Sequence, residues 1–195
     1  MPRRPDLLMT AAGVGSGWAA RAVDTALEGF SADAVISTGF CGALDAALDT
    51  GDVVVGTQVD AGERRFPALA PQTSRKHHTG VVVSIDHVAQ TAAEKARLRA
   101  AGAIAVEMEA GGVAERAASR GLPFYCIKVV TDLASEDMAN DFNSALRPDG
   151  HFDTMIILRR SLRHPLVRIP ELLRLRKRCV RAAQSLGDFI ANCRF

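Results

Sequence analysis

Hydrophobic and polar positions follow two different periods along the chain, one typical of strands and one typical of helices. Short β-branched runs bounded by glycine or proline indicate strands at 7–12, 34–38, 53–59 and 80–85, a buried edge from Gly102, and a strand ending at Asp132. Amphipathic or small-residue stretches indicate helices at 18–28, 92–101, 110–120, 154–163 and 171–192, with a helical turn at 43–48. Strands that alternate with helices predict one α/β domain over residues 1–195, with 154–195 as a C-terminal helical segment packed on it.

The polar stretches between these elements indicate loops and solvated helix faces. Residues 60–79 read as a polar, basic loop, whose adjacent His77 and His78 are expected to be solvated, not metal-bound. In the helix at 92–101, the residues Glu94, Lys95, Arg97 and Arg99 are expected to be exposed. The polar segment 133–153 is long enough to predict a lid or a disordered loop.

The charge is unevenly distributed. The net charge is only +2, yet residues 159–181 carry eight Arg and one Lys against one Glu. Beside an amphipathic helix, this block predicts either contact with an anionic membrane surface or Arg side chains that cover the helix flanks. With one Trp and one Tyr in 195 residues, the chain offers few platforms for stacked bases, so a nucleic-acid partner is not expected.

Targeting and redox signals favour a cytoplasmic protein. No apolar run reaches the eighteen or more residues of a membrane span, and Asp6 with the glycines at 13–17 interrupts the signal-like N-terminus. The four cysteines, at 41, 126, 179 and 193, have no C-x-x-C spacing and are expected to be free thiols. No metal is expected.

Two carboxylates and two glycine segments are the candidates for chemistry. Glu109 and Asp132 stand at element ends around one βα unit, where ligands bind in open α/β sheets. The loop 13–17 precedes a helix, so its backbone N–H groups can meet an anion; a plain strand-to-helix turn would look the same. Gly39 and Gly42 allow close approach of a ligand or close packing.

Two stretches carry a family resemblance. The segment 36–55, ISTGFCGALDAALDTGDVVV, and the segment 103–132, with its V-E-M-E-A run and terminal Thr-Asp, resemble the nucleoside phosphorylase superfamily, which includes purine nucleoside phosphorylases and methylthioadenosine/adenosylhomocysteine nucleosidases. The resemblance implies a three-layer α/β/α sandwich with a mixed central sheet. Residues 83–110 and 145–175 are most similar to the hopanoid-associated branch, which is implied to release adenine from an adenosyl-hopane precursor.

The resemblance also implies roles for single residues. Asp132 matches the acid that protonates the purine at N7, which requires a protonated carboxyl in a partly desolvated site. Glu109 matches the ionised carboxylate that accepts hydrogen bonds from the ribose hydroxyls. Met108 matches the residue beneath the sugar. Thr131, Gly39, Phe40 and Val88 belong to the expected substrate site, with Phe124 as another residue able to stack on the base. Glu107 either belongs to this site or is a solvated or salt-bridged carboxylate.

Departures from the family pattern keep the nucleophile open. Ser37 and Phe40 stand where many phosphorolytic relatives have Arg and Ser, which puts phosphorolysis in doubt. Lys128 stands where nucleosidase relatives often have Arg. Gly13, Gly15 and Ser37 are the candidates for a phosphate or nucleophile pocket, with phosphate as a co-substrate and no cofactor.

The start of the chain bears on both function and assembly. The expected first strand of the family and its Glu or Arg precede Leu7 and are missing. An exposed sheet edge and homo-oligomers would follow. Two function classes stay open: an enzyme that releases adenine from a 5′-modified nucleoside, and a catalytically weak nucleoside-binding or assembly protein.

Overall fold

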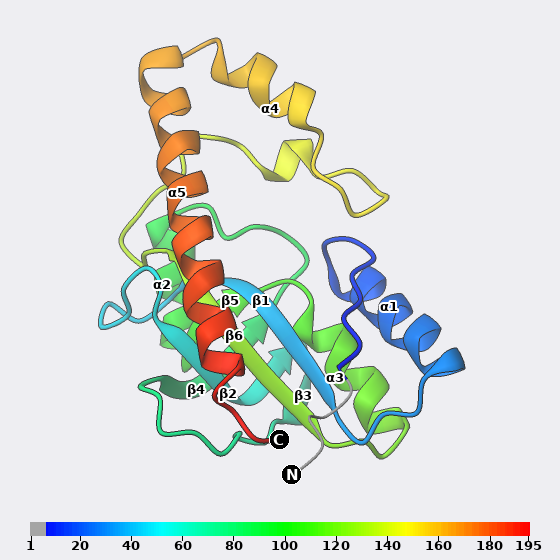
Figure 1. The fold of residues 1–195 in the computed structure, drawn as a ribbon. Helices are drawn as coiled ribbons and strands as arrows, with labels where there is room; N and C mark the ends of the chain where they lie inside the picture. The colour runs from blue at the N-terminus through cyan, green and yellow to red at the C-terminus, as the bar shows by residue number, and fades with distance from the viewer. Residues whose placement is uncertain (1–6) are drawn as a thin grey trace.

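The computed structural model describes residues 7–195, which form a mixed β-sheet with helices on both faces (Figure 1). The elements are α1 (Ser16–Gly29), β1 (Val35–Ala43), β2 (Val53–Ala61), β3 (Arg64–Pro67), β4 (His78–Ser84), α2 (Ala92–Ala100), β5 (Ala103–Glu107), α3 (Ala110–Ser119), β6 (Phe124–Asp132), a 3₁₀ turn (Asn143–Ala145), α4 (Thr154–Ser161) and α5 (Pro165–Ile190). The α/β class is therefore confirmed.

The sheet closes on itself. Its order is β3-β2-β4-β5-β1-β6, and β6 also pairs antiparallel with β2, from Val53 opposite Val129 to Gly56 opposite Cys126. The strand at one end of the order is thereby paired on both sides. Within the described part of the chain, β6 therefore offers no free edge, and the edge of the sheet is the short β3.

Alternating side chains divide the core between the two faces of the sheet, since successive strand residues point to opposite sides. Val54, Cys126 and Val130 pack with α1 and α3. Val53, Val55, Ile127 and Val129 pack under the C-terminal half of α5, whereas α2 covers β4 and β5 through Leu98. Figure 1 shows α5 crossing one face, with α1 and α3 behind the sheet.

Two adjacent glycines at the start of α3 allow this helix to approach α1 and β2 closely. A Cβ on Gly112 would lie 1.9 Å from the backbone oxygen of Ser16 in α1, and one on Gly111 would lie 2.8 Å from the Ala61 Cβ in β2. Real Cβ atoms do not come so close, so the small residues at the start of α3 are required by packing against α1 and β2.

Several predicted elements differ from the observed ones. The strand predicted at 7–12 is absent: these residues have no ladder partner among residues 7–195, and Leu7 and Met9 are exposed. β1 continues through the predicted glycine loop to Ala43, and the helical turn predicted at 43–48 is a short turn at 45–47. The loop predicted at 60–79 contains β3, which forms a hairpin with β2.

The C-terminal helix is longer than predicted because it continues through Pro170. A proline at this position lacks the N–H that would bond to the carbonyl of Leu166. Since Leu166 is 91% exposed, that region of the helix is open to water, which can satisfy the free carbonyl.

Among residues 7–195, no helix combines the length and apolar character needed to cross a bilayer.

Candidate active site

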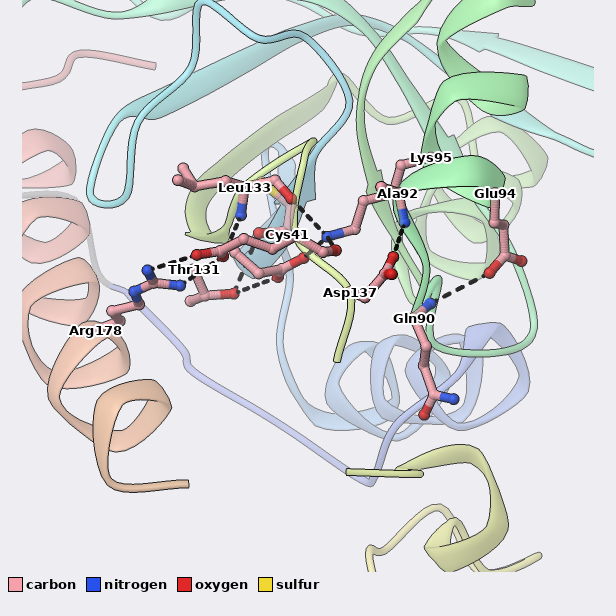
Figure 2. A network of polar contacts seen from close by, with 11 residues as sticks. Cys41, Gln90, Ala92, Glu94, Lys95, Thr131, Leu133, Asp137 and Arg178 are labelled. Atoms are coloured by element: carbon pink, nitrogen blue, oxygen red, sulfur yellow. Dashed lines mark hydrogen bonds and ion pairs between the residues drawn. The ribbon is translucent and has the colours of Figure 1, made fainter. Parts of the chain in front are cut away.

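A buried ion pair lies at the C-terminal end of β6. The ammonium of Lys95, in α2, lies 2.6 Å from Oδ2 of Asp132, and its side chain is fully buried. The same ammonium donates to the backbone oxygens of Leu133, at 2.8 Å, and Glu136, at 3.4 Å. Figure 2 shows Lys95 reaching from α2 toward the strand end that carries Thr131 and Leu133.

The second oxygen of Asp132 also accepts a hydrogen bond. The Thr131 hydroxyl lies 3.1 Å from Oδ1, and this hydroxyl also lies 3.3 Å from the backbone oxygen of Cys41 in β1. The family resemblance implies a protonated Asp132, and the structure places this carboxyl in contact with the Lys95 ammonium. Its side chain keeps 12% exposure, so the carboxyl still reaches a solvent-accessible space.

That space is a pocket of about 270 Å³ between the segment after β6 and α5. Its lining is strongly charged and consists of Asp132, Glu136, Asp137, Met138, Phe142, Glu171, Arg174, Leu175 and Arg178. Arg178 forms a two-pronged pair with Glu136, at 2.7 and 2.8 Å, and these hydrogen bonds hold the pKa of Glu136 below its usual value. Figure 2 shows Arg178 approaching from α5 on the side opposite Lys95.

The segment after β6 is ordered by specific contacts with the turn before α2. The Asn143 side chain donates to the backbone oxygen of Val88, at 2.9 Å, and accepts from its N–H, at 2.7 Å. Oε1 of Gln90 accepts from the N–H of Phe142, at 2.6 Å. The lid or disordered loop predicted for 133–153 is therefore a fixed wall of the pocket.

A second buried ion pair lies at the end of β5. The ammonium of Lys128 is 2.8 Å from Oε2 of Glu107, and each side chain is 1% exposed. The same Oε2 accepts from the backbone N–H groups of Glu109, at 3.0 Å, and Ala110, at 2.8 Å. Burial alone would raise the pKa of Glu107, but the charge and hydrogen bond of Lys128 hold it below its usual value. Oε1 of Glu107 is buried without a partner among the described residues.

Glu109 lies between this pair and the start of α1. Its Oε1 accepts from the N–H of Gly15, at 3.2 Å, and the Ser16 hydroxyl donates to the backbone oxygen of Met108, at 3.1 Å. Burial raises the pKa of Glu109, the nearby Lys128 lowers it, and the charge of Glu107 raises it again, so the pKa lies above its usual value.

The structure brings together some predicted site residues and separates others. Met108 and Glu109 lie beside the glycine loop, and Thr131 lies beside Asp132. Gly15, predicted to meet an anion, donates its N–H to Glu109, and Gly13 packs against Gly150.

The predicted residues of β1 are spread along the strand. Ser37 is buried opposite Cys126, six residues before the end of β6, so it does not lie beside Asp132. Gly39 has a φ of 149°, which favours glycine, and Phe40 is 45% exposed. Phe124 is buried in the core at the start of β6. The strand end itself is formed by Gly42, in register with Asp132.

Sequence reasoning missed Lys95. It predicts an exposed side chain, because the residue stands in a charged helical run, and this prediction is wrong. A signal was present: Lys95 precedes Leu98 by three residues, so the two share the helix face that α2 turns to the sheet. A lysine on an apolar face requires a buried partner.

The cysteines are unpaired thiols, as the sequence predicts. Cys41 and Cys126 are fully buried near Lys128, and burial raises the pKa of Cys126 to about 12. In residues 7–195, no three His, Cys, Asp or Glu side chains gather as metal ligands.

Comparison with known proteins identifies a family model and relatives that are named as nucleosidases. The family model described as the phosphorylase superfamily matches residues 5–75 and 64–149. The 5′-methylthioadenosine/S-adenosylhomocysteine nucleosidase of Staphylococcus saprophyticus is 28% identical over 170 residues, covering 72% of this chain and 75% of that protein. The enzyme of the same name from Staphylococcus aureus strain Newman is 26% identical over the same length.

Solved structures show the same fold. The 5′-methylthioadenosine/S-adenosylhomocysteine nucleosidase of Neisseria meningitidis, in complex with methylthio-immucillin-A, matches with a TM-score of 0.63 at 22% identity, over 93% of this chain and 77% of that one. A futalosine hydrolase mutant of Helicobacter pylori matches with a TM-score of 0.66 at 14% identity, over 93% and 76%.

Proposed function

Because the chain belongs to the phosphorylase superfamily, we propose that it cleaves the N-glycosidic bond of a 5′-modified adenine nucleoside. The observation that carries the proposal is Asp132, a nearly buried carboxyl at a strand end that is held in place and still faces a pocket. The nucleosidase relatives support an adenine leaving group, since their names specify methylthioadenosine and adenosylhomocysteine.

In this proposal the two carboxyl groups have separate tasks. Cleavage develops negative charge on the departing base, and Asp132 in its acid form donates a proton to the purine. General acid catalysis of this kind contributes about 10²–10⁴-fold. Glu109 accepts hydrogen bonds from the ribose hydroxyls and stabilises the positive charge that develops on the sugar.

Water is the nucleophile that the contacts favour. The N–H of Gly15, a candidate phosphate ligand, is bonded to Glu109, and Ser37 lies inside the sheet. Neither is therefore free to bind a phosphate ion beside Asp132. We propose hydrolysis, with phosphorolysis as the alternative that the resemblance to the hopanoid-associated branch favours.

Adenine release from methylthioadenosine, adenosylhomocysteine and adenosine tests this function. We expect release from at least one 5′-thio substrate without phosphate and no rise in rate when phosphate is added. Phosphate dependence together with formation of a ribose 1-phosphate product would show phosphorolysis. A folded protein that binds these nucleosides and releases no adenine would support the weak nucleoside-binding class instead.

The C-terminal helices suggest a surface on which the protein would contact a substrate with a lipid substituent. The arm, residues 154–173, comprises α4 and the first turns of α5 and stands away from the sheet (Figure 1). It exposes large apolar side chains among several arginines: Met155, Leu158, Leu162, Leu166, Val167 and Leu173. Apolar side chains flanked by positive charge are typical of helices that lie on an anionic bilayer.

We propose that the arm binds an anionic membrane surface, which would suit a hopanoid-type 5′ substituent. Like charges on the arm disfavour pairing with the arm of a second copy. Wild-type protein should pellet with vesicles of phosphatidylcholine and phosphatidylglycerol and not with phosphatidylcholine alone. Leu162→Ser/Leu166→Ser should abolish pelleting, whereas Leu69→Ser, an exposed apolar residue on the body, should not. Equal pelleting of all variants would contradict the proposal.

Self-association is proposed from the family resemblance, since the pairing of β6 with β2 leaves only the short β3 at the edge of the sheet. Light scattering on wild type and on Leu162→Ser/Leu166→Ser would show whether the arm contributes. A dimer that the double variant disrupts would assign the arm to a second copy and not to lipid.

A further inference from the structure

We infer that Lys95 is the positioning residue of the site: it fixes the carboxyl of Asp132 in the orientation in which that carboxyl faces the pocket. The inference rests on the proposed function, because it assigns Asp132 the role of acid. Lys95 is not among the site residues that the sequence predicts. We propose that it acts on the reaction only through Asp132.

The hydrogen bonds of Lys95 exclude direct contact with a substrate. An ammonium has three donors. Those of Lys95 face Oδ2 of Asp132, the backbone oxygen of Leu133 and the backbone oxygen of Glu136. With all three engaged and the side chain fully buried, Lys95 has no donor left for a ligand in the pocket.

The same contacts fix the carboxyl from two sides. Lys95 is part of the first turn of α2, where its N–H bonds to the backbone oxygen of Thr91, the residue that caps the helix. The neighbouring strand β1 also approaches closely, since a Cβ on Gly42 would lie 2.8 Å from Oδ2 of Asp132. The carboxyl is therefore held between a helix start and a neighbouring strand, which restricts its orientation.

The charges around Asp132 come from several elements. Lys95 approaches from α2 in direct contact, and Arg178, on α5, interacts with Asp132 at longer range. The thiols of Cys41 in β1 and Cys179 in α5 lie close to Asp132: burial raises their pKa, and the charge of Asp132 also raises it. Glu136 is already paired with Arg178. Lys95 is thus the cation in closest contact with Asp132.

Three variants test the inference through kinetics. Lys95→Met should lower kcat by about 10²-fold, the loss that a misplaced group can cause, with KM changed less than about threefold. Lys95→Arg keeps the charge but not the three-donor geometry, so it should also lower kcat. Arg97→Met removes an exposed charge from the same helix and should behave as wild type.

A double-mutant cycle separates positioning from general stability. If Lys95 acts through Asp132, then in the Asp132→Asn background the change Lys95→Met should cost no further activity. Additive losses, or a kcat of Lys95→Met within twofold of wild type, would overturn the inference. If Lys95→Met does not fold, Lys95→Arg decides: an unchanged kcat would also overturn it.

A measurement that needs no substrate distinguishes this inference from the proposed function. At one fixed pH, the side-chain ¹³C signal of Asp132, assigned by its loss in Asp132→Asn, should differ in chemical shift and linewidth between Lys95→Met and wild type, because the carboxyl loses the ammonium that fixes it. An unchanged signal would contradict positioning by Lys95. If wild type released no adenine while the signal changed, the proposed function would fail and the pairing of Lys95 with Asp132 would stand.

Discussion

The molecule contains two buried lysine–carboxylate pairs, and they differ in what surrounds the carboxylate. Lys128 and Glu107 are both sealed at 1% exposure, and Glu107 also accepts two backbone N–H groups at the start of α3. Lys95 is equally buried, but its partner Asp132 keeps 12% exposure toward a pocket. A sealed pair can only support its neighbours, here Glu109, whereas an open pair can exchange a proton with a ligand.

The largest expected effect separates the two pairs by stability. Lys128→Met leaves Glu107 charged and sealed, so unfolding by urea should show a loss of about 3–5 kcal/mol, the usual cost of breaking a buried pair. Lys95→Met should cost less, because water in the pocket can reach Asp132. Lys128→Met/Glu107→Gln should recover much of the loss. Equal losses for the two lysine variants would break the distinction between a sealed and an open pair.

A smaller effect is expected from crowding the open pair without changing any charge. Gly42→Ala places a Cβ 2.8 Å from Oδ2 of Asp132, so the carboxyl must move. We expect kcat to fall about tenfold or more, since small displacements of a reacting group are costly. Gly187→Ala in α5, where a Cβ meets nothing within 4 Å, is the matched control and should retain kcat. Equal activity of both variants would show that the position of the carboxyl is not critical.

The smallest expected effect concerns how stability depends on pH at Glu109, the neighbour of the sealed pair. The pKa of Glu109 is raised by burial, so ionising it in the folded state costs stability as pH rises from its ordinary value through the raised one. Glu109→Gln removes this cost and keeps an acceptor for the N–H of Gly15. Measured by urea unfolding, the variant should gain stability relative to wild type as pH rises above the ordinary pKa of a glutamate, about 4.3, by at most about 1.4 kcal/mol for each unit by which the pKa is raised.

The opposite sign applies to Glu107. Its pKa is lowered by Lys128, so its contribution to stability is present at neutral pH and is lost as pH falls through the lowered value. If Glu109→Gln instead lost stability relative to wild type with rising pH, Glu109 would belong with Glu107 as a structural carboxylate.

Only part of the fold and of the two ion pairs could be predicted from the sequence. Both carboxylates of the site follow from their places at the ends of elements, and the local pattern correctly located most of β2, β4, β6 and the helices. The strand predicted at 7–12 failed because local pattern does not reveal whether a strand has a neighbour. Lys95 and the β2–β6 closure were missed for a related reason: both depend on contacts between segments far apart in the chain.

The measurement that tests the account most directly compares two aspartates of one pocket. Asp132→Asn removes the proposed acid, while Asp137→Asn keeps the carbonyl oxygen that can accept from the N–H of Ala92. With adenine release as the readout, we predict a fall in kcat of about 10²–10⁴-fold for the first variant and less than threefold for the second. Comparable activity of Asp132→Asn and wild type would contradict the account, because the open pair would then have no part in the chemistry.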